Sequence, residues 1–154
     1  MSENKKRVAS PARVAAYIRV SGAGGAFSKM LETEKTQFET GIKNHANWTF
    51  TGCYADSCPV TGERPELARL LDDCRADNID IIVTKGTSRI SKKPAEIVKI
   101  ALELAMLKNP VGIYFMEEDC FTLSSVEIFC LGGLAAIESE KRSQEETGVN
   151  ADDE

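Results

Sequence analysis

Cationic side chains follow three of the predicted strands at the point where each strand ends. Arg19 and Ser21 close the first apolar run, Arg64 follows the second and Arg89 follows the third. In open α/β sheets ligands bind beyond the carboxyl ends of the strands, so we expect these loops to meet at one edge. Guanidinium groups match phosphate oxygens and can stabilise a pentacovalent phosphoryl transition state without a metal ion. The pattern therefore indicates an anion site, although one such arginine alone is more typical of a surface ion pair.

A glycine-rich segment follows the first predicted strand. Residues 22–25 read Gly-Ala-Gly-Gly and lack both the third glycine of a dinucleotide fingerprint and the Lys-Ser/Thr ending of a P-loop. The segment predicts either a mobile loop that lets Ser21 approach a bulky substrate or a turn that binds nothing. His45, the only histidine, lies in a predicted helix far from any strand end, which disfavours a Ser-His-Asp triad. Residues 117–119, Glu-Glu-Asp, are more typical of a solvated turn than of a metal site, so we expect no metal and no cofactor.

Four short apolar runs alternate with helical patterns, and this alternation is the main signal of fold class. The run at residues 81–83 is β-branched and is expected to be buried on both faces of a sheet. The sequence predicts an α/β fold with a mostly parallel sheet of four to five strands flanked by helices. The predicted strands are residues 14–18, 49–54, 81–83 and 111–116.

Apolar residues at helical spacing appear between the predicted strands. Phe38, Ile42 and His45 recur at i, i+4 and i+7, with Thr33 as the predicted N-cap. Prolines at positions 65 and 94 suit the first turns of two further helices. The inward residues of these two helices are predicted to be Leu67, Leu70, Leu71 and Cys74 in one, and Ile97, Ala101 and Leu104 in the other.

The longest helical pattern spans residues 125–147 and completes the predicted fold with a long C-terminal helix. Val126, Cys130, Gly133 and Ile137 line one face, and the first half is apolar almost all round. The pattern fits equally a core helix that ends in a solvated turn and a helix that packs on its own domain and on a partner. The expected divisions are a flexible basic segment 1–12, a core 13–124, the helix 125–147 and a disordered acidic tail 148–154.

Charge is distributed unevenly along the 154 residues. The net charge of −5 argues at first sight against a nucleic-acid binder, but residues 1–19 carry five basic side chains against one acid. Residues 138–154 carry seven acids against two basic side chains. No segment reads as a secretory signal, and the longest apolar run is half of the ~20 residues that span a membrane. The five cysteines form no C-x-x-C pair, which favours reduced thiols in a cytoplasm over a disulfide framework.

Several motifs occur together in a specific order. Residues 17–21 read Tyr-Ile-Arg-Val-Ser, and Asp56 precedes Thr-Gly at 61–62 and Arg-Pro-Glu-Leu at 64–67. The third motif consists of residues 79–85 followed by Ser-Arg-Ile-Ser at 88–91. The remaining features are Gln37 in the first predicted helix and residues 136–142 near the C-terminus. From Arg13 to Gly148 the chain resembles the catalytic domain of the serine recombinases, the resolvase and invertase family, and its shape is closest to the large serine recombinases. The resemblance implies a resolvase-like fold.

The resemblance also implies the chemistry of a DNA recombinase. In it Ser21 attacks a DNA phosphodiester, forming a 5′-phosphoserine bond and freeing a 3′-hydroxyl. Arg19, Arg64 and Arg89 are implied as catalytic ligands of the phosphate oxygens, with Lys92 as a further contact. Asp56 is one candidate for the base, although we expect the arginine cluster to carry more of the catalysis. The expected DNA-phosphate contacts are Arg19, Arg64, Ser88, Arg89, Lys92 and Lys93.

The sequence departs from the family pattern in three places. Lys92 and Lys93 stand where the family usually has Arg-Asn, and lysine lacks the bidentate fork of arginine. The loop at 62–64 is shorter than usual. The DNA-binding domain that family members carry after the long helix is missing, which indicates an excised or naturally truncated catalytic domain. We therefore expect weak DNA binding and no activity from the domain alone.

The implied partners are DNA and further copies of the chain. Cutting both strands at two sites needs four subunits, so we expect a homodimer that forms a homotetramer in the synaptic complex. The expected location is a bacterial cytoplasm, with a phage or mobile element as a candidate source. Two other functions remain open. One is a recombinase-like oligomerisation module without catalysis, and the other is an α/β domain that binds a phosphate-containing cofactor, which nucleotides or flavin would stabilise and DNA would not.

Overall fold

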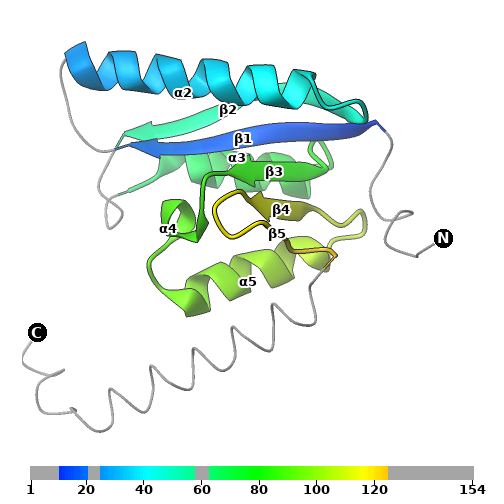
Figure 1. The fold of residues 1–154 in the computed structure, drawn as a ribbon. Coiled ribbons are helices and arrows are strands. Elements are labelled where there is room, and N and C mark those ends of the chain that lie inside the picture. Colours follow the sequence, from blue (N-terminus) through cyan, green and yellow to red (C-terminus); the bar gives the residue numbers. More distant parts are fainter. Residues whose placement is uncertain (1–10, 21–24, 58–62, 125–154) are drawn as a thin grey trace, which may run out of the picture.

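A five-stranded sheet organises the computed structural model, which describes residues 11–20, 25–57 and 63–124 (Figure 1). Its strand order is β2-β1-β3-β4-β5, and every neighbouring pair is parallel except β4 with β5. The mostly parallel α/β sheet predicted from the sequence is confirmed. The strands are β1 (Ala12–Val20), β2 (Trp48–Ser57), β3 (Ile81–Thr84), β4 (Gly112–Phe115) and β5 (Cys120–Phe121).

Helices cover both faces of the sheet, with α2 on one side and α3 and α5 on the other (Figure 1). Successive side chains of β1 point to opposite faces, so this central strand contributes to two cores. Ala15 and Tyr17 pack with the buried residues of α3 and α5, whereas Val14 and Ile18 pack with α2. The helices are α2 (Gly25–Lys43), α3 (Pro65–Arg75), a short α4 (Thr87–Ile90) and α5 (Pro94–Ala105).

The predicted inward faces of α3 and α5 agree with the structure. Leu67, Leu70 and Cys74 are buried in α3, and Leu71 packs against the same core while half-buried. Ile97, Ala101 and Leu104 are likewise buried in α5. The strand predicted at residues 81–83 is buried on both faces, as expected for a β-branched run in a parallel sheet.

The prediction for α2 was wrong at both ends. The helix begins at Gly25, so Thr33 is an interior residue whose Oγ1 donates a hydrogen bond to the Lys29 carbonyl oxygen, at 2.9 Å. A threonine that satisfies its hydroxyl in this way sits inside a helix and does not mark its start. The helix ends at Lys43, and His45 is exposed and stacks on Trp48, with 3.9 Å between the ring centroids.

One strand is longer than predicted, and two short elements were missed. The strand predicted at 49–54 extends to Ser57, because Asp56 pairs with Arg19, and Ser57 with Val20, as β2 continues alongside β1. The segment after the strand predicted at 81–83 contains α4, for which no helix was predicted. The strand β5 has only two residues, too few for alternation to reveal it in the sequence.

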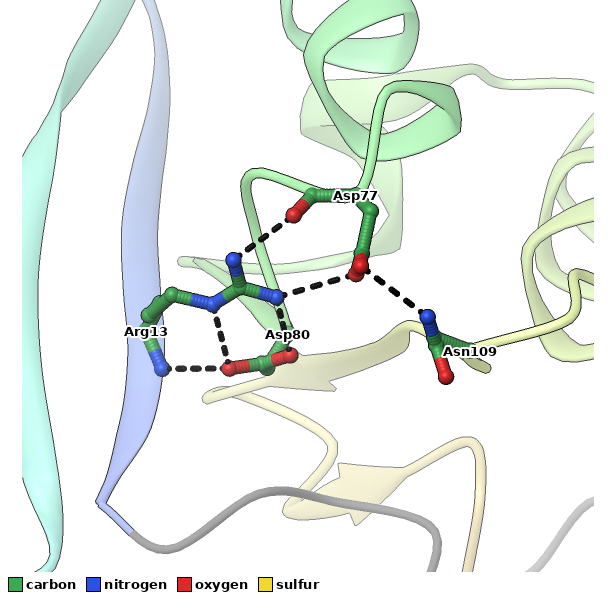
Figure 2. A network of polar contacts seen from close by, with 4 residues as sticks. All are labelled: Arg13, Asp77, Asp80 and Asn109. Atoms are coloured by element: carbon green, nitrogen blue, oxygen red, sulfur yellow. Dashed lines mark hydrogen bonds and ion pairs between the residues drawn. The ribbon is translucent and has the colours of Figure 1, made fainter.

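A polar network joins the start of β1 to the start of β3 (Figure 2), at the opposite end of these strands from α4 (Figure 1). The Nε and Nη2 atoms of Arg13 each donate to one carboxylate oxygen of Asp80 at 2.9 Å, and the Arg13 backbone N–H donates to the same carboxylate at 2.8 Å. Arg13 also donates to the carbonyl and carboxylate oxygens of Asp77, which in turn accepts from Asn109. The network therefore joins the strand start to the loops that precede β3 and β4.

We expect Asp80→Asn to lower the free energy of unfolding by about 2–3 kcal/mol, because it breaks a buried, charge-assisted contact. Burial opposes ionisation of Asp80, but the hydrogen bonds from Arg13 outweigh it and lower the pKa of Asp80. The contribution of Asp80 is therefore present above its unfolded pKa of about 4 and is lost as the pH falls through the lower folded pKa. Urea unfolding at pH 7 and at stepwise lower pH measures this loss.

Asp72→Asn is the matched control for Asp80→Asn. Asp72 also pairs with an arginine, at 2.8 Å from Arg75, but its side chain is 74% exposed, so we expect a loss below about 1 kcal/mol. Two results would contradict the proposed contribution of ionised Asp80. One is an equal loss of unfolding free energy in the two variants, and the other is a difference between them that does not shrink below pH 4.

The described cysteines Cys53, Cys74 and Cys120 are free thiols, in agreement with the prediction for these three residues. Burial raises the pKa of the Cys74 thiol to about 12 and also raises the pKa of Cys53 and Cys120. Such thiols are protonated at neutral pH and are poor nucleophiles. Among the described helices, none is long and apolar enough to cross a membrane.

Candidate active site

The short helix α4 lies beyond the carboxyl end of β3 and beside the end of β1 (Figure 1). Two contacts join it to Arg19, the penultimate residue of β1. Arg89 Nη1 donates to the Arg19 carbonyl oxygen at 2.8 Å, and Arg19 Nη2 lies 3.4 Å from the Ser88 carbonyl oxygen. These reciprocal contacts bring one guanidinium group from β1 and one from α4 to the same edge of the sheet.

Arg64 reaches the same helix from a third direction. It is the N-cap residue of α3, and its Nη1 donates to the carbonyl oxygen of Ile90, the last residue of α4. The side chain is 14% exposed, which leaves it little freedom of orientation. Three arginines from separate segments of the chain therefore meet at one four-residue helix.

Asp56 holds the first turn of α3 in place. This carboxylate is 3% exposed and accepts hydrogen bonds from the Tyr17 hydroxyl at 2.8 Å and from the backbone N–H groups of Glu66 and Leu67 at 2.9 and 3.0 Å. The Arg64 side chain forms no cap of its own, so Asp56 caps the helix from the neighbouring strand. These contacts give Asp56 a positioning task beside Arg64, which the sequence did not reveal.

The remaining cationic candidates lie between α4 and α5. Lys92 and Lys93 are exposed, and the Lys93 backbone N–H donates to Oγ of the buried Ser91 at 3.0 Å. Ser88 is exposed on α4. The side chains of Ser88, Lys92 and Lys93 are therefore open to solvent, and each lies within three residues of Arg89 or Ile90 in the chain.

Some predicted site residues lie outside the described residues, namely Ser21, Thr61 and Gly62. The predicted long helix at 125–147 and the segments 1–12 and 148–154 fall wholly or largely outside them too. Ser21 directly follows Val20, the last residue of β1, so the chain leads from Arg19 to the candidate nucleophile within two residues.

The electrostatics of the described site favour an anion. Arg64 has one nearby carboxylate among the described residues, with 3.7 Å between its Nη2 and Oε1 of Glu96 in the first turn of α5. Within the described ranges, no carboxylate oxygen lies within 4 Å of Arg89. Arg89 uses one of its five N–H donors on Arg19, and the others remain available to oxygen ligands. The same ranges contain no group of three or more His, Cys, Asp or Glu residues that could hold a metal ion.

The fold and these residues define an α/β domain with three arginines gathered beyond the carboxyl ends of its central strands. The family model described as Resolvase, N terminal domain, matches residues 14–151. The chain therefore belongs to this family and is the catalytic domain of a site-specific serine recombinase. The family, the fold class and the recombinase function predicted from the sequence are confirmed.

Three solved structures share the fold. The N-terminal catalytic domain of TP901-1 integrase is 24% identical, over 86% of this chain and 98% of that one, with a TM-score of 0.68. A resolvase family site-specific recombinase from Streptococcus pneumoniae is 18% identical, over 91% and 95%, with a TM-score of 0.72. The C-terminal catalytic domain of ISC1926 TnpA, an IS607-like serine recombinase, is 14% identical, over 68% and 70%, with a TM-score of 0.51. No curated protein matches the chain.

Proposed function

We propose that the domain cleaves and rejoins DNA through a covalent bond to Ser21. Ser21 Oγ attacks the scissile phosphorus, the P–O3′ bond breaks, and the products are a 5′-phosphoserine and a free 3′-hydroxyl. The serine proton is lost and the departing 3′ oxygen gains one. One phosphodiester replaces another, so the bond energy is kept in the phosphoserine and no external energy source is needed. The observation that carries the proposal is the convergence of Arg19, Arg64 and Arg89 on α4, beside the strand end that leads to Ser21.

The arginines act by stabilising charge in the transition state. Arg19 and Arg89 bind the non-bridging oxygens, and Arg64 is held towards the same helix by the Ile90 carbonyl oxygen. Preoriented donors of this kind gain most where negative charge increases during the reaction. Lys92 supplies a further contact, and Ser88 and Lys93 bind flanking DNA phosphates. Asp56 supports Arg64 through the first turn of α3, and no base is assigned to it.

Assembly of the active complex joins several copies of the chain. We propose a homodimer in solution and a homotetramer in the synaptic complex, because two double-stranded cuts require four serines. Support comes from an apolar region on the α2 side of the sheet, with hollows of about 220 and 420 Å³ that share Trp48 and Tyr114. Sedimentation velocity with and without DNA tests this assembly.

The proposed division of the chain assigns residues 13–124 to the catalytic core and 125–147 to a long dimerisation helix. The basic segment 1–12 and the acidic segment 148–154 flank them. We propose a bacterial cytoplasm as the location and a mobile element as the source, in line with the neighbour that is an integrase.

Because we expect the domain alone to be inactive, the test joins it to a DNA-binding domain of known target and supplies a half-site with a nick near the cleavage position. Loss of the short fragment beyond the cut traps the covalent complex, which migrates slowly in a denaturing gel. We expect the adduct at a DNA 5′ end, with the modified peptide containing Ser21 and a free 3′-hydroxyl on the other fragment. A 3′-linked adduct, or modification of another residue, would overturn the proposal.

Lys92→Arg tests the departure from the family pattern. Arginine adds a bidentate donor at the same exposed position, so we expect adduct formation to be retained or to rise by up to about tenfold. Lys99→Arg, an exposed position on α5, is the control and should leave the rate unchanged. Complete loss of cleavage in Lys92→Arg would show that the lysine is required as it stands.

A further inference from the structure

The helix α4 is too short to be stable by itself, although contacts to all three site arginines run through it. Backbone hydrogen bonds at 3.1 Å close its ends, from Arg89 N–H to the Gly86 carbonyl oxygen and from Ser91 N–H to the Thr87 carbonyl oxygen. A single helical turn is unfavourable without outside support, because it orders several residues for very few bonds. Its N-cap residue, Gly86, has no side chain that could cap it.

The missing support comes from Glu118, in the turn between β4 and β5. Thr87 Oγ1 donates to Glu118 Oε2 at 2.9 Å, and the Thr87 backbone nitrogen lies 3.4 Å from both carboxylate oxygens. A carboxylate at this position satisfies an unpaired N–H of the first turn and interacts favourably with the helix dipole. Glu118 is thus the capping group of a helix 31 residues away in the chain.

The turn that carries Glu118 is itself attached to the start of α4. The backbone N–H groups of Met116 and Glu117 donate to the carbonyl oxygens of Thr84 and Lys85 at 3.0 and 2.7 Å, which extends the pairing of β3 with β4. The approach is close at Gly86, where a Cβ atom would lie 2.3 Å from Oε1 of Glu117. The turn and the helix therefore pack as one unit.

We infer that Glu118 is a positioning residue for the phosphate site. By capping α4 it holds the Ser88 and Ile90 carbonyl oxygens and the Arg89 guanidinium where Arg19 and Arg64 meet them. The inference rests on the proposed function for the identity of the substrate. A carboxylate beside a phosphate site repels the substrate, so a Glu118 that contributed only charge would slow the reaction, and its removal would speed it.

Two substitutions separate these possibilities, with Glu117→Ala as the matched control. Glu118→Ala removes both the acceptor and the charge, whereas Glu118→Gln keeps an acceptor oxygen and removes only the charge. If Glu118 positions α4, Glu118→Ala cleaves the nicked half-site about tenfold more slowly at saturating DNA, and Glu118→Gln stays within about threefold of the unmodified protein. Glu117 shares the turn and the charge without a hydrogen bond from α4, so Glu117→Ala cleaves at the unmodified rate.

Two measurements without cleavage complete the test. Amide exchange at Ser91 is expected to quicken about tenfold in Glu118→Ala, because its N–H closes α4. Inorganic phosphate, titrated against the arginine Nε–H resonances, is expected to bind Glu118→Ala about tenfold more weakly. Unchanged exchange and phosphate affinity, or faster cleavage in both Glu118 variants, would overturn the inference. If the unmodified domain forms no adduct even when it is joined to a DNA-binding domain, the proposed function fails, and exchange and phosphate binding still decide the role of Glu118.

Discussion

Ser21→Ala is expected to abolish the covalent protein–DNA adduct, with a loss of at least about three orders of magnitude in the rate of its formation. The reason is chemical: alanine has no atom that can form the bond to phosphorus. The arginines remain, so DNA affinity should change by less than about twofold. Trapping on the nicked half-site measures the rate, and fluorescence anisotropy of the same DNA measures the affinity.

Ser57→Ala provides the control for Ser21→Ala. Ser57 is an exposed serine at the end of β2 and pairs in register with Val20, so it lies next to the same strand end. We expect its adduct formation to be unchanged. An adduct that persists in Ser21→Ala would show that another residue is the nucleophile, whereas equal losses in the two variants would point to a disturbed sheet edge.

Arg89→Ala should slow adduct formation by roughly 10²–10³-fold, the range typical of losing one preoriented donor to a transition-state oxyanion. The effect combines the lost charge with the lost hydrogen bond to the Arg19 carbonyl oxygen, which holds β1 against α4. Arg89→Lys should recover little of the rate, because an ammonium group cannot bind two oxygens in the planar arrangement of a guanidinium. Single-turnover cleavage with saturating DNA measures the chemical step.

Arg75→Ala is the matched control for Arg89→Ala. Arg75 lies in the last turn of α3 and pairs with Asp72 and Glu103 on an exposed surface, away from α4. Its removal should cost less than about 1 kcal/mol of stability and leave the cleavage rate unchanged. If Arg89→Ala lowers the cleavage rate by less than about tenfold while its thermal stability is retained, Arg89 does not stabilise the transition state.

The acidic net charge is compatible with a site that binds DNA phosphates. Arg19, Arg64 and Arg89 lie together at one edge of the sheet, whereas much of the acidity belongs to residues 138–154. Local potential governs contact with a phosphate, because charges farther away than about 10 Å are largely screened at ordinary ionic strength. Net charge was therefore a poor guide to function in this chain.

Periodicity predicted the elements with extensive buried faces. The stripe of Leu67, Leu70 and Cys74 and the β-branched run at 81–83 lie where the patterns placed them, since burying apolar area dominates the choice of structure in long elements. Thr33 failed as a helix start, because its hydroxyl bonds within the helix. Helix α4 has four residues and strand β5 has two. Elements this short show no periodic pattern, so the sequence did not predict them.

Patterns among neighbouring residues are enough to predict the fold class, the family and the segments that carry Arg19, Arg64 and Arg89, because strand ends and short motifs are local features. The way in which those segments meet follows from the packing of the whole domain. The capping of α3 by Asp56 and of α4 by Glu118 joins residues 10 and 31 positions apart. Such contacts depend on strand order and on register across the sheet, and no local pattern encodes which distant carboxylate reaches which helix.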